Sequence, residues 1–136
     1  MKLHYEVAGD DLVWAGAAAS DLKNELKRLG ICPEVIRKTA VAMYEAEINM
    51  VIHADGGSID VDISPDSILV TLKDNGVGIP DIEKAMIEGY STASEEVRDM
   101  GFGAGMGLPN IKRCADVLKI TSEIGVGTTV EIQVNI

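Results

Sequence analysis

Two segments of the sequence read as β-hairpins, and any fold of this chain has to pair both of them. In the first, Ile59, Val61 and Ile63 alternate with polar residues, and the turn Ser64-Pro-Asp-Ser67 leads into a second apolar strand at Ile68–Lys73. The second joins strands at Val117–Glu123 and Thr128–Asn135 through Ile124-Gly-Val-Gly127. Turns this short pair strands antiparallel, so at least part of the sheet is antiparallel.

Helical patterns occupy much of the remaining chain. The expected elements are a strand at Lys2–Val7, a helix capped by Asp10 or Asp11 that runs to about Leu29 with Gly30 as its stop, a helix from Pro33 to about Ala54 ended by Gly56-Gly57, a short helix from Asp81 to about Glu88, and a helix from Leu108 to about Asp116. This order predicts one domain, residues 1–136, of the α+β class. We expect a two-layer sandwich with a mixed, mostly antiparallel sheet and helices on one face.

Charge and composition narrow the functional classes. The net charge of −10 argues against a nucleic-acid partner, which requires a basic surface, and favours another protein. No apolar run approaches the ~20 residues of a membrane span, and the N-terminus lacks the hydrophobic stretch of a secretory signal. Cys32 and Cys114 are far apart in the sequence, which is typical of reduced thiols. These features predict a cytoplasmic protein.

Four alternating glycines, Gly101, Gly103, Gly105 and Gly107, precede the last predicted helix. Glycines let backbone amides approach a ligand, and the start of a helix offers free N–H groups to a phosphate. The spacing fits neither a Walker A loop nor a Rossmann loop. The run alone therefore leaves two interpretations, a phosphate-binding loop or a flexible hinge.

Two further groups of residues carry candidate chemistry. Glu45, Asn49 and His53 share one face of the second helix, where oxygen groups suit magnesium binding or general-base work, or simply form a polar helix edge. Asp74-Asn-Gly-Val-Gly78 directly follows a strand, where an aspartate could accept a hydrogen bond from an amino group such as adenine's. The alternative is an ordinary turn built from aspartate and glycine.

Taken in order, four segments resemble the ATP-binding superfamily shared by gyrase, the Hsp90 chaperones, histidine kinases and MutL. They are Glu45-x-x-x-Asn49, Asp74-x-Gly76-x-Gly78, Gly101–Leu108 and Gly127-Thr-Thr129. The fold implied is the Bergerat ATP-binding fold. Because the chain is short, it looks like the small serine kinases that act as anti-sigma factors or as stressosome switch kinases. The residues after Ser91-Thr92 depart from both subgroups, so the choice between them stays open.

The resemblance implies a role for each matching residue. Glu45 would be the general base and Asn49 would hold magnesium. Asp74 would bind the adenine amino group, with Gly76 and Gly78 beside the ring and Thr129 supporting Asp74 or a bridging water. The backbone amides of Gly105, Met106, Gly107 and Leu108 would bind the phosphates of ATP. The stretch 90–104 would form a lid whose motion Gly101 and Gly103 permit. Arg98 or Lys112 would supply positive charge near the γ-phosphate.

These roles predict an ATP- and magnesium-dependent serine/threonine protein kinase. Its implied substrate is a small STAS-type antagonist protein, and a sigma factor or a phosphatase would be the competing partner. Dimerisation through the sheet or the N-terminal region is a further expectation from the resemblance. Two alternatives remain: a nucleotide-dependent binding module without kinase activity, and a free-standing catalytic domain of the histidine-kinase type.

Overall fold

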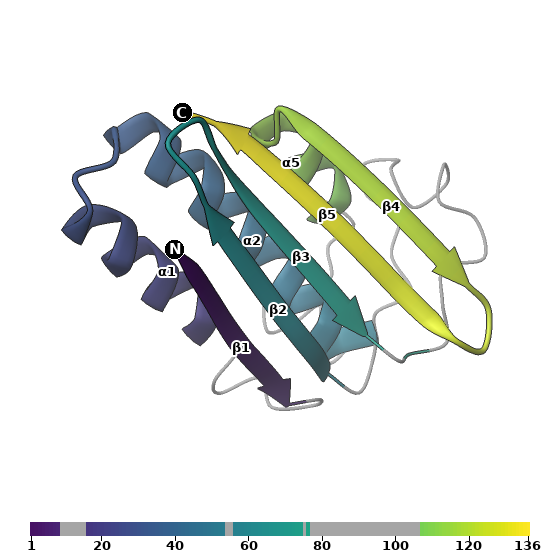
Figure 1. Cartoon of the computed structure of the whole chain (residues 1–136). Coiled ribbons are helices and arrows are strands. Elements are labelled where there is room, and N and C mark those ends of the chain that lie inside the picture. Colours follow the sequence, from purple (N-terminus) through teal and green to yellow (C-terminus); the bar gives the residue numbers. More distant parts are fainter. Residues whose placement is uncertain (9–15, 54–55, 75, 77–106) are drawn as a thin grey trace, which may run out of the picture.

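The fold comprises five strands and three helices in the part of the chain that the computed structural model describes, residues 1–8, 16–53, 56–74, 76 and 107–136 (Figure 1). In chain order the elements are β1 (Lys2–Ala8), α1 (Ala17–Arg28), α2 (Pro33–His53), β2 (Gly56–Ile63), β3 (Ser67–Asp74), α5 (Gly107–Cys114), β4 (Val117–Glu123) and β5 (Gly127–Asn135). The predicted helix at 81–88 and the predicted lid lie outside the described residues. None of the described helices has the length and hydropathy needed to cross a bilayer.

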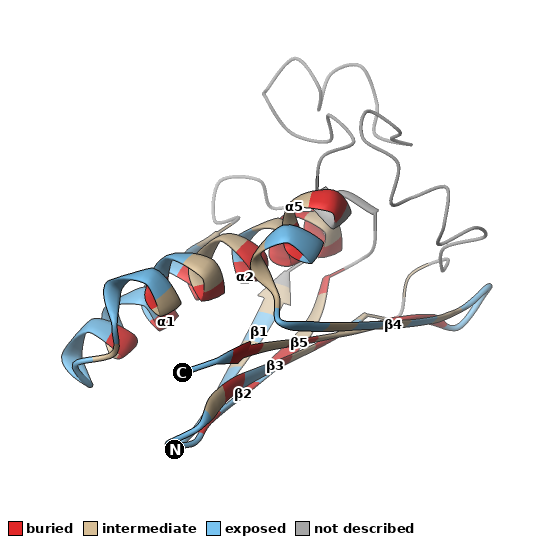
Figure 2. Cartoon of the chain, turned by 90° about the horizontal axis from the view of Figure 1, so that it is seen from above, coloured by how far each residue is buried: buried red, intermediate tan, exposed pale blue. Residues whose placement is uncertain are grey.

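The strands form one sheet in the order β1-β2-β3-β5-β4, with every neighbouring pair antiparallel. Helices α1, α2 and α5 cover one face of this sheet (Figure 2). The predicted α+β two-layer sandwich is therefore confirmed. The described sheet is wholly antiparallel rather than mixed, and both predicted hairpins, β2–β3 and β4–β5, are present.

The core lies between the sheet and the helix layer. Along β3, Ile68, Val70 and Leu72 are buried and alternate with more exposed positions, as expected for a strand with one wet face. The fully buried side chains that face them from the helices share an aliphatic character and include Leu22 and Leu26 of α1, Met43 of α2 and Ile111 of α5. Helix α2 packs against both α1 and α5, so it fixes the positions of the other two helices.

The two ends of α1 are built differently from one another. Its C-terminus is as predicted, because Gly30 has φ +75° and the amides of Gly30 and Ile31 donate to the carbonyls of Lys27 and Leu26. The prediction for its start was wrong. The N-cap residue is Gly16, at φ +91°, which has no side chain to cap the helix. The helix therefore begins at Ala17 rather than just after Asp10 or Asp11, which lie outside the described residues.

The glycine pair after α2 also differs from the expectation. Helix α2 ends at His53, and Gly56 and Gly57 are the first residues of β2 rather than a helix stop. A Cβ at Gly57 would lie 2.0 Å from the carbonyl oxygen of Lys73 and 2.6 Å from the Met50 side chain. Only glycine therefore allows β2 to approach the end of β3 this closely.

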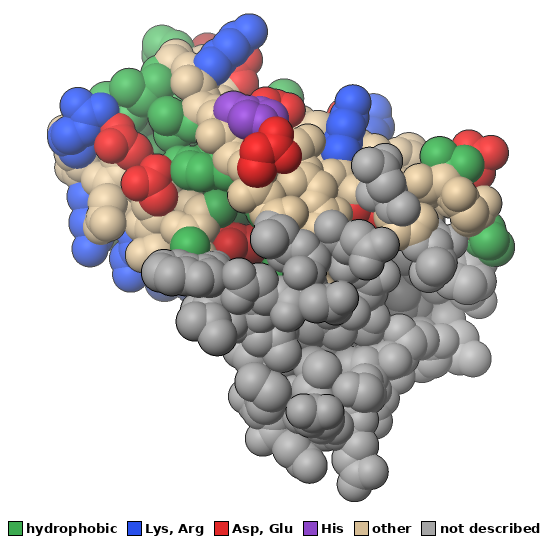
Figure 3. All heavy atoms as spheres, turned by 90° about the horizontal axis from the view of Figure 1, so that it is seen from below, with side chains coloured by type: hydrophobic (Ala, Val, Ile, Leu, Met, Phe, Trp, Pro, Cys, Tyr) green, Lys and Arg blue, Asp and Glu red, His purple; other side chains and the backbone are tan. Residues whose placement is uncertain are grey.

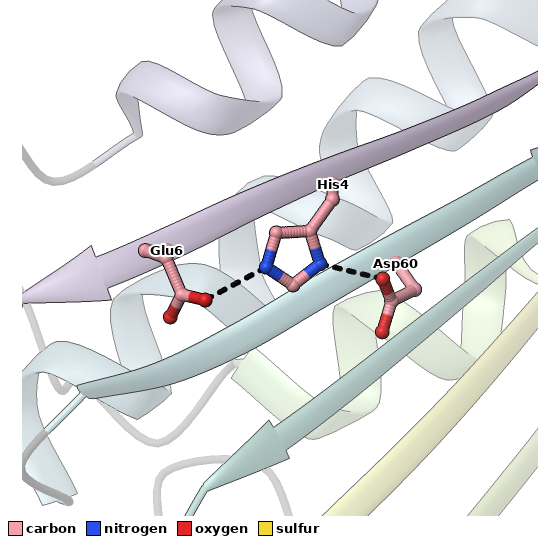
Figure 4. Close-up of polar contacts among 3 residues, drawn as sticks. All are labelled: His4, Glu6 and Asp60. Carbon is pink, nitrogen blue, oxygen red and sulfur yellow. Dashed lines mark hydrogen bonds and ion pairs between the residues drawn. The ribbon is translucent and has the colours of Figure 1, made fainter.

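The face of the sheet opposite the helices is polar, and His4 of β1 links two carboxylates there (Figure 4). Its Nδ1 lies 2.6 Å from Oδ1 of Asp60 in β2, and its Nε2 lies 2.7 Å from Oε1 of Glu6. The hydrogen bond with Asp60, followed by that with Glu6, raises the pKa of His4 above 6.5. A protonated ring can donate from both nitrogens, so the charged form best suits this site.

Because the pKa of His4 is raised in the folded state, its contribution to stability is complete below pH 6.5 and is lost as the pH rises through the folded pKa. We therefore expect His4→Gln to lower the urea midpoint of unfolding more at pH 6 than at pH 9. Urea titrations of both proteins at the two pH values measure this difference. An equal gap at both pH values would show that the charge on His4 does not stabilise the fold.

In the view from below (Figure 3), lysine and arginine side chains of the described residues lie along the left and upper edges, and several aspartate and glutamate side chains lie nearer the middle. This distribution accords with the net charge of −10.

Candidate active site

Asp74 ends β3 with its side chain on the helix-covered face, the face shared by Val70 and Leu72. Its Oδ1 accepts two backbone hydrogen bonds, from Gly76 at 2.9 Å and from Thr128 of β5 at 3.2 Å. The first closes a turn of the Asx type and the second ties the carboxylate to the neighbouring strand. Since both bonds end on Oδ1, the described contacts leave Oδ2 to accept a hydrogen bond from a ligand.

The threonine that supports Asp74 is Thr128 rather than the predicted Thr129. Thr128 is 8% exposed, and its Oγ1 lies 2.9 Å from the hydroxyl of Ser122 in β4. Thr129 is paired with Lys73 and belongs to the opposite face of the sheet, because its neighbour Val130 packs against the core. The motif contains two adjacent threonines, and only the strand register decides which one faces the site.

Glu45 and Asn49 lie one turn apart on α2, so they share a face of the helix, and both are half-buried. The Oε1 of Glu45 accepts a hydrogen bond from Nδ2 of Asn110, in α5, at 3.4 Å. Glu45 and Asn110 are 65 residues apart in the sequence. Their hydrogen bond brings the carboxylate of the first motif to the first turn of α5, which follows the glycine-rich motif.

Glu47 is a buried carboxylate that the sequence interpretation missed. It is 2% exposed, and it accepts hydrogen bonds from the backbone amides of Gly16 at 2.8 Å, Ala18 at 3.3 Å and Ala19 at 2.9 Å. Helix α1 is thus capped by a side chain from α2 instead of by its own sequence. The available signal was position: Glu47 is one turn from the buried Met43 and Val51, on the apolar face of α2.

Comparison with known proteins decides the family. The profile of the histidine kinase-, DNA gyrase B-, and HSP90-like ATPases matches residues 36–136. This chain belongs to that ATPase family. Membership implies that it binds ATP, and the matched residues include Glu45, Asp74 and α5.

Among the relatives, the serine/threonine-protein kinase RsbT of Bacillus subtilis is 32% identical over 123 residues, which are 87% of this chain and 86% of that protein. The anti-sigma F factor of Geobacillus kaustophilus is 35% identical over 105 residues, 73% of this chain and 67% of that protein. Within the ATPase family, the chain therefore belongs with the small serine/threonine kinases of the anti-sigma group.

Solved structures share the fold at low sequence identity. The mycobacterial sensor histidine kinase MprB superposes with a TM-score of 0.57 at 15% identity, covering 99% of this chain and 97% of that one. A chain of the SiaB–SiaC complex from Pseudomonas aeruginosa gives 0.64 at 12% identity, covering 97% and 88%.

The phosphate-binding segment expected of this ATPase is described only in part. Gly107 and Leu108 are the first two residues of α5, where backbone amides have no partner within the helix. Gly78, Gly105 and Met106 lie outside the described residues, as does Arg98. Lys112 is exposed in the last turn of α5, at the opposite end of the helix from Gly107.

Proposed function

We propose that this serine/threonine kinase transfers the γ-phosphoryl group of ATP to a serine or threonine hydroxyl on a small STAS-type antagonist protein. The observation that carries the proposal is the meeting of Glu45 with the first turn of α5 through Asn110. The carboxylate that would act as general base thereby lies beside the helix start that would hold the phosphates. Phosphoryl transfer requires this kind of positioning more than it requires covalent help from the protein.

In the proposed reaction, Glu45 accepts the hydroxyl proton while the substrate oxygen attacks the γ-phosphorus. The bond between that phosphorus and the bridging oxygen breaks, and ADP leaves. The amides at the start of α5, those of Gly107 and Leu108 together with Gly105 and Met106, would bind the phosphates and oppose their negative charge.

The same proposal assigns adenine to Asp74. Its Oδ2 would accept a hydrogen bond from the adenine amino group, while Gly76 and Gly78 would leave room for the ring beside the backbone. The two amides bound to Oδ1 support this assignment, because they hold the carboxylate in one orientation.

Magnesium fits this site as a companion of ATP. The described residues contain no cluster of three His, Cys, Asp or Glu side chains that could hold a metal. Mg²⁺ commonly takes one protein oxygen and completes its shell with phosphates and water. The amide oxygen of Asn49, one turn from Glu45, is suited to that single contact, and the bound ion would neutralise charge on the phosphates.

Regulation would arise from competition between partners. The relationship to RsbT and to anti-sigma F factors supports a second regulator, a sigma factor or a phosphatase, that binds the kinase in exclusion of the STAS protein. A homodimer is a further part of this proposal, as is a cytoplasmic location.

The proposal is tested by incubating the purified chain with radiolabelled ATP, magnesium and each STAS-domain protein encoded in the same genome. We expect label on one of them as acid-stable phosphoserine or phosphothreonine. An acid-labile phosphate would indicate a histidine kinase. ATP-dependent capture of a partner without labelling would indicate a binding module.

The adenine assignment predicts that Asp74→Asn lowers ATP affinity about 100-fold and leaves the fold intact. Asparagine keeps an oxygen for the amides of Gly76 and Thr128, but it replaces Oδ2 with a donor that opposes the adenine amino group. Calorimetric titration with ATP measures the affinity, and thermal unfolding checks the fold. A folded variant with unchanged affinity would rule out this role for Asp74.

A further inference from the structure

Asn110 connects two parts of the site that the sequence motifs treat separately. It belongs to the first turn of α5, the helix whose start would hold phosphate, and its Nδ2 lies 3.4 Å from Oε1 of Glu45 on α2. Hydrogen bonds of catalytic groups are often long in the free enzyme and tighten in the reacting complex. A ligand seated at the start of α5 would act directly on this contact.

Arg113 fixes the orientation of the Asn110 amide. Its guanidinium Nη1 donates to Oδ1 of Asn110 at 3.3 Å, one turn along the same helix. Because a guanidinium can only donate, Oδ1 faces Arg113 and Nδ2 faces Glu45. An ionised carboxylate can only accept, so in the order Arg113, Asn110, Glu45 each contact joins a donor to an acceptor.

We infer that Asn110 is a positioning residue that holds the carboxylate of Glu45 in the orientation needed for proton abstraction and couples it to the phosphate-binding helix. The inference rests on the proposed function, since it takes Glu45 to be the base. Asn110 needs no contact with ATP or substrate for this role. Its effect should therefore appear in kcat and depend on the presence of Glu45.

The test is a double-mutant cycle of Asn110→Ala and Glu45→Gln, with initial rates of phosphate transfer measured at saturating ATP and substrate. We expect Asn110→Ala to lower kcat about tenfold in the otherwise unchanged protein, as for loss of a hydrogen bond to a charged group. In the Glu45→Gln protein it should change the residual rate less than twofold. The dissociation constant for ATP should stay within twofold in both proteins.

Asn110→Asp is a second variant that tests the inference if Asn110→Ala is unstable, because aspartate preserves the shape of the side chain. It replaces the donor with a second carboxylate beside Glu45, so we expect a larger loss of kcat than for Asn110→Ala. Asn24→Ala is the matched control, since Asn24 is exposed on α1, away from α5, and should leave kcat unchanged.

Equal losses of kcat from Asn110→Ala in both backgrounds would overturn the inference, as would an unchanged kcat or a loss explained by weaker ATP binding. Its failure is distinguishable from failure of the proposed function. If Glu45→Gln abolishes transfer and both Asn110 variants are fully active, only the positioning role is wrong. If Glu45→Gln is itself fully active, Glu45 is not the base and the proposed mechanism fails with it.

Discussion

Replacing Glu47 with alanine is expected to lower the free energy of unfolding by about 3 kcal/mol or more. The carboxylate is 2% exposed and satisfies three backbone amides at the start of α1, those of Gly16, Ala18 and Ala19. Leaving a buried donor unpaired costs about 1–3 kcal/mol. Domains of this size are stable by only about 5–15 kcal/mol, so much of the fold's margin depends on this side chain. Urea unfolding followed by circular dichroism measures the loss.

Glu34→Ala is the matched control for this prediction. Glu34 lies on the same helix, but it is exposed, and its ion pair among the described residues is with Arg37, at 3.6 Å. Its removal should cost less than about 1 kcal/mol. Glu47→Gln should fall between the two, because one amide oxygen remains as an acceptor while the new NH2 group faces backbone donors. Equal losses for Glu47→Ala and Glu34→Ala would show that the cap does not stabilise α1.

The error at the start of α1 shows which information a local pattern lacks. Asp10 and Asp11 precede a helical pattern in the manner of N-caps, and this made them the local choice. The actual cap comes from Glu47, 28 to 31 residues away from the amides it binds. No rule that reads one helix at a time can find a cap supplied by another helix.

The strands, by contrast, could be predicted well because their information is local. The alternation of Ile59, Val61 and Ile63 with polar residues marks both the strand and its buried face, and the register of β2 with β3 follows from the short turn between them. Gly57 was wrongly predicted to end a helix, because the need for glycine there comes from a residue distant in the sequence. The carbonyl oxygen of Lys73 occupies the space that a side chain at position 57 would need.

The residues of the candidate site also fall into two groups, those that could be predicted from the sequence and those that could not. Glu45 and Asp74 could be selected from the sequence because each belongs to a motif of fixed spacing whose order resembles a known family. Their partners could not, because Thr128 meets Asp74 across 54 residues and Asn110 meets Glu45 across 65. Motifs thus select the candidate groups for the chemistry, and only the packed structure identifies the residues that contact them.

Glu45→Gln is expected to reduce the rate of phosphate transfer by about 100-fold to 10,000-fold, the usual contribution of a general base. Glutamine has the shape of glutamate and keeps an oxygen that can accept from Asn110, so the packing of α2 against α5 should persist. What it loses is the capacity to take the substrate proton. ATP affinity should therefore stay within about twofold of the original, because the loss concerns the transition state alone.

Single-turnover measurements with radiolabelled ATP and excess kinase separate this chemical step from substrate release. Asn24→Ala, exposed on α1, serves again as the control for general effects of substitution. A Glu45→Gln protein that binds ATP normally and transfers phosphate within tenfold of the original rate would exclude Glu45 as the base. A protein that fails to bind ATP would instead assign Glu45 to the nucleotide site. Normal ATP binding with transfer almost lost is the combination that a proton-accepting role of Glu45 predicts.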